Sequence, residues 1–341
     1  MSLPALWAVR SAFPNAHIGL LSNADVKNPH YVSAEKVLPP DGLIDEWLTY
    51  PTNLGKAAAL SSLVRLAIGL RRSQFDSVVY LMPRMRTIEQ IDRDLRFFRF
   101  AGIRRSIGVN YLRKTGLKQP IPRPTPVVES ESEHLLRCLT FDGIKIDVNA
   151  LAPNLMLSDA EISAANNWFL NAAGGSYGDR RLVAVAPGSK WASKVWPEDR
   201  FEAVIGRMIS PHGIYPIIFG GQEDSDKADR LIGKWKSGVN AAGKLTVRES
   251  AALLRECELY VGNDTGTMHL AAAVDTKCVA VFASIDWRGR WAPYGSGHTV
   301  FRHTVECEGC YSPDCFNAYK CLDLTGVDDV YEACVRALQP L

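Results

Sequence analysis

The sequence has no long hydrophobic segment, because no apolar run in its 341 residues reaches the roughly 18 residues that a membrane-spanning helix needs. It also shows no secretory signal peptide at its start. With 47% hydrophobic and 22% charged residues, the composition is that of an ordinary globular protein. We therefore expect a cytoplasmic protein with about two domains, each large enough to bury its own core.

Two further absences narrow the classes of function. No G-x-G-x-x-G motif follows the first predicted strand, which argues against a nicotinamide-dependent dehydrogenase. No recognisable nucleic-acid-binding motif is present, so we expect no nucleic acid partner. A basic block nevertheless runs from Arg65 to Arg123, with 14 Lys and Arg against 4 Asp and Glu. Such a block favours an anionic partner, either a phosphorylated or carboxylated glycan or a membrane surface. The alternative is a set of solvated helix faces.

Apolar periodicity predicts two series in which strands and helices alternate, joined by a linker over residues 143–154. Capping boxes at Ser158/Glu161 and Thr246/Glu249 mark two helix starts. The first series has strands at 17–21, 43–48, 77–81 and 106–109 and helices at 56–70, 88–100 and 131–140. The second has strands at 182–186, 214–219, 259–261 and 278–282 and helices at 197–209, 224–236, 247–256 and 267–273.

This alternation predicts an α/β protein with parallel sheets. We expect two doubly wound, Rossmann-like domains facing a cleft. The predicted domains are residues 1–150 and residues 151–325, with a C-terminal helix at 326–341 that packs back on the first domain.

Two turns of the second series combine glycine with charged or polar side chains. The first follows the strand at 182–186 and carries Ser189, Lys190 and Lys194; the second follows the strand at 259–261 and carries Asp264 and His269. A strand-to-helix turn presents free backbone N–H groups and the positive end of a helix dipole, which attract phosphate. Two such turns in one domain indicate a nucleotide-diphosphate site, although every α/β domain also has ordinary turns of this kind.

At these positions the sequence resembles glycosyltransferase family 9, the lipopolysaccharide heptosyltransferases and their relatives. The resemblance covers nearly the whole chain and implies the GT-B fold. It is carried by Pro187-Gly-Ser189, Lys194-Val-Trp-Pro197 with Phe201, Gly220-Gly221-Gln-Glu223, and Gly262-Asn-Asp-Thr-Gly266 with His269-Leu-Ala-Ala-Ala273. The function it implies is an inverting transfer of a sugar from a nucleotide-diphosphate donor, with ADP-heptose favoured, to an anionic glycolipid acceptor such as a lipopolysaccharide core.

The residue types in the two turns suit such a donor. We expect Lys194 and the helix start at Thr265 and Gly266 to stabilise the leaving diphosphate, with no cofactor required. Gly188, Ser189 and Lys190 would contact the phosphates or ribose, and by resemblance Glu223 would bind the ribose hydroxyls. Asp264 would bind sugar hydroxyls or cap the helix. His269 would touch the diphosphate or the sugar, or else be a packed core residue.

Members of the family begin with a strand and a Gly-Asp turn whose Asp is the presumed catalytic base, and that Asp would precede Met1 here. We expect a misplaced chain start. The alternatives are a catalytically silent protein that binds nucleotide-sugar and a nucleotide-sugar epimerase of the same fold.

Arginines of the basic block are the candidate acceptor contacts. Arg84 and Arg86 follow the strand at 77–81 at its carboxyl end, the ligand side of a parallel sheet. In the helix at 88–100, Arg93, Arg96 and Arg99 share one broad face, and Ile91, Leu95 and Phe98 are expected to pack inward. The alternative is that these arginines pair with Glu89, Asp92 and Asp94. A lipid-anchored acceptor would bring the chain to the periphery of the inner membrane.

Four of the eight cysteines, Cys307, Cys310, Cys315 and Cys321, lie within fifteen residues. In a cytoplasmic protein, this spacing is compatible with a structural zinc site. Against zinc, Cys315 and Cys321 do not form a second short C-x-x-C pair. Reduced structural cysteines and disulfides are the alternatives.

Overall fold

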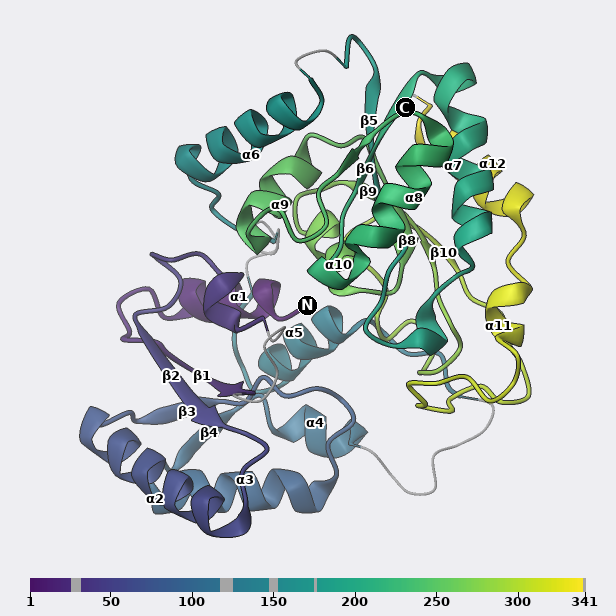
Figure 1. Cartoon of the computed structure of the whole chain (residues 1–341). Helices are drawn as coiled ribbons and strands as arrows, with labels where there is room; N and C mark the ends of the chain where they lie inside the picture. Colours follow the sequence, from purple (N-terminus) through teal and green to yellow (C-terminus); the bar gives the residue numbers. More distant parts are fainter. Residues whose placement is uncertain (26–31, 117–124, 147–152, 175–176, 340–341) are drawn as a thin grey trace. The chain divides into compact units, whose positions relative to one another are not determined.

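The computed structural model describes residues 1–25, 32–116, 125–146, 153–174 and 177–339. The chain divides into two compact units (Figure 1). The first comprises residues 1–121 and 131–155, and the second comprises residues 122–130 and 156–341. The segment 122–130 therefore belongs to the second unit, whereas the sequence predicts a first domain that covers residues 1–150. Part of the predicted linker, residues 147–152, lies outside the described residues.

The second unit is built on a six-stranded sheet in which every neighbouring pair is parallel. The strand order is β10-β9-β8-β5-β6-β7, so the chain moves outward in both directions from the β5/β8 pair. In doubly wound sheets, ligands bind beyond the carboxyl ends of the strands at such a switch point. The strands are β5 (Arg181–Ala186), β6 (Ile214–Ile218), β7 (Val239–Asn240), β8 (Leu259–Asn263), β9 (Lys277–Val281) and β10 (Thr299–Phe301).

Helices cover both faces of this sheet, because side chains of a strand alternate between faces. From β5, Val183 and Val185 enter one core cluster, and Leu182 and Ala184 enter the other. The first cluster takes buried side chains from α7 (Glu198–His212), α8 (Ser225–Trp235) and α12 (Val327–Ala337). The second takes them from α6 (Asp159–Ala172), α9 (Val247–Arg255) and α10 (Gly266–Ala272). The short elements are η3 (Ala192–Lys194), η4 (Gln222–Asp224) and α11 (Lys320–Asp323).

The first unit follows the same α/β plan with shorter strands. Strands β1 and β2 pair in parallel, and so do β3 and β4. Helices α1 and α5 contribute to one core cluster, and α2 contributes to another, which α3 flanks. The elements are α1 (Leu3–Ala12), β1 (Gly19–Ala24), η1 (Ala34–Lys36), β2 (Glu46–Pro51), α2 (Lys56–Ser73), β3 (Ser77–Val79), α3 (Ile88–Phe100), β4 (Arg105–Ile107), α4 (Asn110–Thr115) and α5 (Glu131–Phe141).

The structure confirms the predicted order of strands and helices, and most boundaries shift by a few residues. Both capping boxes form, at Ser158/Glu161 and Thr246/Glu249. The predicted C-terminal helix exists as α12, but its buried residues Val330, Ala333 and Cys334 enter the core of the second unit. That this helix also packs back on the first domain stays a prediction. Among the residues with described positions, no helix combines the length and apolarity that crossing a bilayer requires.

Candidate functional site

The two polar turns lie side by side at the carboxyl ends of β5 and β8. These strands are adjacent and parallel, with Ala186 opposite Gly262, so the chain leaves both at the same edge of the sheet. The first turn leads through η3 into α7, and the second leads through Asp264 and Thr265 into α10. The sequence predicts that both turns form one site, and the sheet topology brings them together at its switch point.

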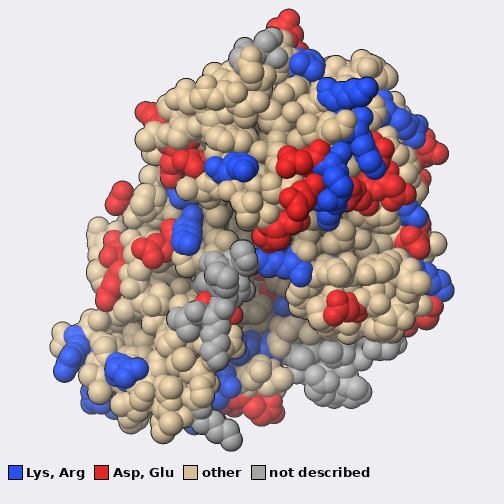
Figure 2. Space-filling model, in the orientation of Figure 1, with Lys and Arg blue, Asp and Glu red and all other residues tan. Residues whose placement is uncertain are grey.

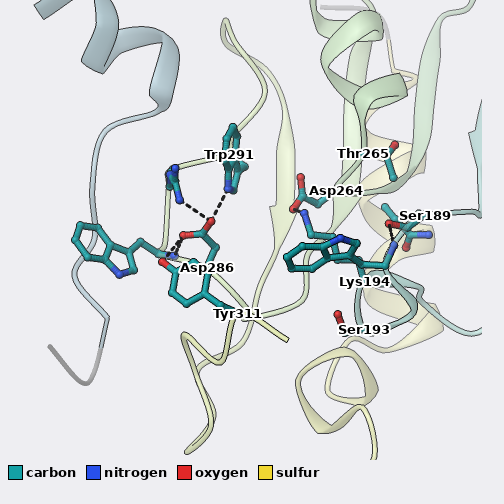
Figure 3. Close-up of polar contacts among 12 residues, drawn as sticks. Ser189, Ser193, Lys194, Asp264, Thr265, Asp286, Trp291 and Tyr311 are labelled. Atoms are coloured by element: carbon teal, nitrogen blue, oxygen red, sulfur yellow. Dashed lines mark hydrogen bonds and ion pairs between the residues drawn. The ribbon is translucent and has the colours of Figure 1, made fainter. Parts of the chain in front are cut away.

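An ion pair joins the two turns: Lys194 Nζ donates to Asp264 Oδ2 at 2.6 Å (Figure 3). The side chains are 19% and 8% exposed, respectively. Burial raises the pKa of Asp264, and the ammonium group of Lys194 opposes that rise. Of the two roles expected for Asp264, helix capping is wrong, because the N-cap of α10 is Thr265. The cation expected to meet phosphate is thus held by a buried carboxylate.

The start of α10 leaves backbone donors at the same edge, because the first N–H groups of a helix have no partner within it. The Thr265 side chain makes no capping hydrogen bond; its Oγ1 lies 3.4 Å from the Tyr260 hydroxyl. In the part of the chain that is described, His269 Nδ1 is buried without a hydrogen-bond partner. Burial also lowers the pKa of His269, so the imidazole is neutral at physiological pH. Its ring lies 6.4 Å from that of Trp291.

Asn263, the last residue of β8, connects the two turns through its amide. Its Oδ1 accepts the backbone N–H of Trp196 at 3.0 Å, and its Nδ2 donates to the carbonyl of Gly188 at 3.3 Å. The side chain is fully buried. The residue belongs to the Gly262-Asn-Asp-Thr-Gly266 motif, but the sequence alone predicts no role for it. Its position immediately before Asp264, at the end of a buried strand, is the feature of the sequence that could have indicated a role in the site.

The first turn is compact, and some of its polar groups make contacts that hold the turn itself. A Cβ at Gly188 would collide with the carboxylate of Asp224, so only glycine fits there without displacing that group. Ser189 Oγ accepts the N–H of Trp191 at 3.3 Å, and Lys190 is exposed. Glu223 lies in η4 after β6, the other neighbour of β5, and is exposed. All of the predicted donor residues therefore belong to the second unit, with Glu223 one strand away from the paired turns.

A second polar cluster, not predicted from the sequence, surrounds Asp286 beyond β9 (Figure 3). Its Oδ1 accepts the Tyr311 hydroxyl at 2.7 Å, and its Oδ2 accepts Trp291 Nε1 at 2.6 Å and Arg290 Nη1 at 2.9 Å. The charge of Asp286 also contributes to the raised pKa of Asp264. The cluster fixes the loop that presents Trp291 to His269.

The four clustered cysteines line one small cavity together with Ser193, the residue before Lys194. All eight cysteines of the chain are free thiols, so the disulfide alternative was wrong. Among the described side chains, no group of three His, Cys, Asp or Glu is arranged to hold a metal ion. Ser193 also ties the cysteine loop to η3, since its N–H and Oγ donate to the carbonyls of Pro313 and Ser312 at 3.0 and 2.7 Å. This loop therefore supports Lys194.

The candidate acceptor arginines are in the first unit. Arg84 is buried, and its backbone N–H donates to the Glu131 carboxylate. Arg86 pairs with Asp94 at 3.1 Å, and Arg93 pairs with the same carboxylate at 2.8 Å. These contacts favour the ion-pairing alternative for Arg86 and Arg93. In α3, Ile91 and Leu95 are buried as expected, and Phe98 is half-buried against the core.

Residues 97–320 match the model of glycosyltransferase family 9 (heptosyltransferase), which is more than half of the sequence. The chain belongs to this family. Lipopolysaccharide heptosyltransferase 2 of Salmonella typhimurium is 27% identical over 138 residues, 39% of this chain and 38% of that protein. Lipopolysaccharide heptosyltransferase 3 of Escherichia coli is 31% identical over 126 residues, 36% of each chain. These alignments span less than two fifths of those relatives.

Solved structures of family members match over nearly the full length. The family 9 glycosyltransferase of Veillonella parvula has a TM-score of 0.69 at 19% identity, covering 99% of this chain and 92% of its own. The ADP-heptose lipopolysaccharide heptosyltransferase II of Escherichia coli has a TM-score of 0.62 at 18% identity, covering 99% and 94%. The fold is therefore the GT-B fold expected from the motifs.

Proposed function

We propose that this family 9 glycosyltransferase transfers a heptose from ADP-heptose to a glycan acceptor of the lipopolysaccharide core type, with inversion at the anomeric carbon. The relatives named above are heptosyltransferases, and an Escherichia coli heptosyltransferase that shares the fold was solved with ADP-2-deoxy-2-fluoro heptose. The observation that supports the proposal most directly is the buried Lys194–Asp264 pair at the switch point of the sheet.

The paired turns offer what a departing nucleoside diphosphate needs. In the transfer, the acceptor hydroxyl gives its proton to a general base as its oxygen bonds to the anomeric carbon. The bond from that carbon to the diphosphate oxygen breaks, with its electron pair on the diphosphate. Lys194 and the first N–H groups of α10 would stabilise that negative charge. Neutral His269 would donate to a diphosphate oxygen, or donate to or accept from a sugar hydroxyl, which satisfies its buried Nδ1. Asp264 would accept hydrogen bonds from the sugar hydroxyls.

These roles need no metal, so we expect the transfer to proceed without added divalent cations. A zinc ion held by Cys307, Cys310, Cys315 and Cys321 remains a separate prediction, for which thiolate is the preferred ligand chemistry. Metal analysis of the purified protein tests it. One zinc per chain, lost in a Cys307→Ser/Cys310→Ser variant, would support it, and a metal-free protein would contradict it.

Lys194→Ala tests the donor site. Loss of a charge-assisted hydrogen bond should weaken ADP binding by about 1.5–3 kcal/mol. Titration calorimetry with ADP measures this, at a temperature where circular dichroism shows the variant to be folded. Lys234→Ala is the matched control, because Lys234 pairs with Glu202 on the outer surface of α8 and should leave ADP affinity unchanged.

Unchanged ADP affinity in Lys194→Ala would remove the donor site from these turns. The identity of the reaction has a separate test, in which ADP-heptose and a truncated lipopolysaccharide acceptor are incubated with the chain. Mass spectrometry should detect one added heptose. A donor sugar that is changed in configuration and released without transfer would indicate the epimerase alternative.

A further inference from the structure

Helix α2 carries apolar side chains on its solvent-facing side. Leu60, Val64 and Ile68 recur every four residues and are 64%, 45% and 47% exposed. A spacing of four residues places them in one row along the helix. The neighbouring Leu63 is 43% exposed. Four large aliphatic side chains of one helix are therefore left in water.

The same helix already has a separate face for the protein core. Ala67 and Leu70 are buried in one cluster with Ala101 and Ile103. The exposed row is not part of this core cluster. Contiguous apolar surface of this kind, when polar residues surround it, is typical of an interaction site.

The charged residues of α2 itself are all basic. Helix α2 contains no Asp or Glu between Lys56 and Ser73. Arg65, Arg71 and Arg72 are exposed, and none of these three has an acidic partner within 4.0 Å among the described residues. In Figure 2, the region at the lower left, where α2 runs in Figure 1, is tan with blue patches. The helix that carries the row therefore also carries these exposed arginines.

We propose that the outer face of α2 docks on an anionic lipid surface, with Leu60, Val64 and Ile68 in the headgroup region and the arginines on lipid phosphates. Helices with an apolar row and basic flanks bind membrane interfaces in this way. Contact with a second copy through the same face is disfavoured, because it would oppose arginines to arginines with no acidic residue in either helix. The inference rests on α2 alone and does not depend on the transferase reaction.

Flotation of the full chain with lipid vesicles tests this docking. We expect binding to vesicles of phosphatidylcholine and phosphatidylglycerol in equal parts, and much weaker binding to phosphatidylcholine alone. The Leu60→Gln/Val64→Gln/Ile68→Gln variant should bind the anionic vesicles at least roughly 30-fold more weakly, since each side chain then loses its apolar burial. Glutamine is a good helix former, so α2 should persist, and circular dichroism checks this.

The charged part of the face has its own variant. Arg65→Gln/Arg71→Gln/Arg72→Gln should weaken binding to the anionic vesicles by about fivefold per arginine. It should leave the weak binding to phosphatidylcholine unchanged. Leu170→Gln is the control, because Leu170 is an exposed leucine of α6 in the second unit and its replacement should have no effect.

Two outcomes would overturn the proposal. One is equal binding of the wild-type chain and the apolar variant to the anionic vesicles, or no binding by either. The other is a dimer in light scattering that dissociates in the apolar variant while vesicle binding is absent, which would assign the face to a second copy. Transfer of heptose to a detergent-free, water-soluble acceptor should be unchanged in both α2 variants.

Discussion

The two units share one folding plan but place their charged residues differently. In the second unit, the chain gathers Lys194, Asp264 and Asp286 at the carboxyl ends of its strands, in contact with buried or half-buried partners. On the outer surface of α7 and α8, acidic and basic residues alternate and pair, as the adjoining red and blue in Figure 2 show. In the first unit, α2 has positive charge without acidic residues beside exposed leucines.

This difference indicates two kinds of recognition. Buried, mutually paired polar groups preorganise a site for a small charged ligand, because they cost little reorganisation when the ligand arrives. Unpaired exposed arginines beside apolar side chains suit an extended anionic surface instead. If burial causes this difference, substitutions at the buried groups of the second unit should cost more stability than substitutions at the exposed groups of the first unit.

The first prediction compares Lys194→Ala with Arg93→Ala. Removing Lys194 leaves the buried Asp264 carboxylate without its partner and should destabilise the fold by about 3–5 kcal/mol. Arg93 is 62% exposed in its pair with Asp94, so its loss should cost at most about 1 kcal/mol. Urea unfolding of both variants measures the difference. Equal losses would show that burial does not distinguish these pairs.

The Lys194→Ala loss should also depend on pH. Without the lysine, the already raised pKa of Asp264 rises further, so the folded chain binds a proton that the unfolded chain releases. The extra instability should be absent below about pH 4, the unfolded pKa of Asp, and grow as the pH rises. A loss that increases toward low pH would contradict this assignment of charge.

The second prediction concerns the amide that joins the two turns. Asn263→Asp replaces the Nδ2 donor to Gly188 with a carboxylate oxygen in a fully buried position. An unsatisfied buried polar group costs about 1–3 kcal/mol, and more when it is charged. We expect a loss of stability in that range by urea unfolding and weaker ADP binding by calorimetry. Unaltered ADP affinity would show that the turns keep their spacing without this bridge.

The third prediction compares one partly buried ion pair in each unit. The Arg248 guanidinium holds the pKa of Glu161 down to about 2. A depressed pKa of this kind stabilises the fold above the unfolded Glu pKa, and the stabilisation is lost as the pH falls from about 4.3 toward 2. Glu161→Gln should therefore destabilise the chain by about 1–3 kcal/mol at pH 7 and by less near pH 3.

In the first unit, Asp45 is held by the Ile18 N–H and by Arg10, which lower its pKa, but its side chain is 37% exposed. Screening by solvent should limit the effect of Asp45→Asn at pH 7 to about 1 kcal/mol or less. Thermal melts of both variants across pH give the comparison. A larger loss of stability for Asp45→Asn than for Glu161→Gln would contradict the expected difference between the units.

The smallest effect is expected for Arg86. Since Arg86 is paired with Asp94, Arg86→Ala should raise the KM for an anionic acceptor by only a few fold, about 1 kcal/mol or less. Steady-state kinetics measures this change in KM. Arg113→Ala is the control, because Arg113 of α4 pairs with Asp92, which lies in α3 as Asp94 does. No change in KM would remove Arg86 from the acceptor contacts.

Local signals made much of the fold predictable. The boundaries of α3 follow from the Thr87 cap and the spacing of Ile91 and Leu95. Buried strands such as β5 and β8 read as short apolar runs. Strands β7 and β10, with two and three residues, were not predicted, because only their neighbours in the sheet define them. The position of α12 was not predictable locally, because it depends on core contacts with residues that lie far away in the sequence.

The candidate site was predictable where charge and glycine stand next to a strand end. This pattern predicted Lys194, Asp264 and His269 as candidate site residues. That Lys194 pairs with Asp264 could not be predicted, because it depends on β5 and β8 being neighbours. Asp286 and Tyr311 were missed for a similar reason, since they come together only through a loop that folds over β9.

The Lys194–Asp264 pair also has a consequence for proton balance. A diphosphate that shares Lys194 with Asp264 weakens the contact that opposes the rise in the Asp264 pKa. The carboxyl group would then take up a proton, so that nucleotide binding and proton uptake become linked. The heat of ADP binding should therefore vary with the ionisation enthalpy of the buffer, and this dependence should disappear in Asp264→Asn.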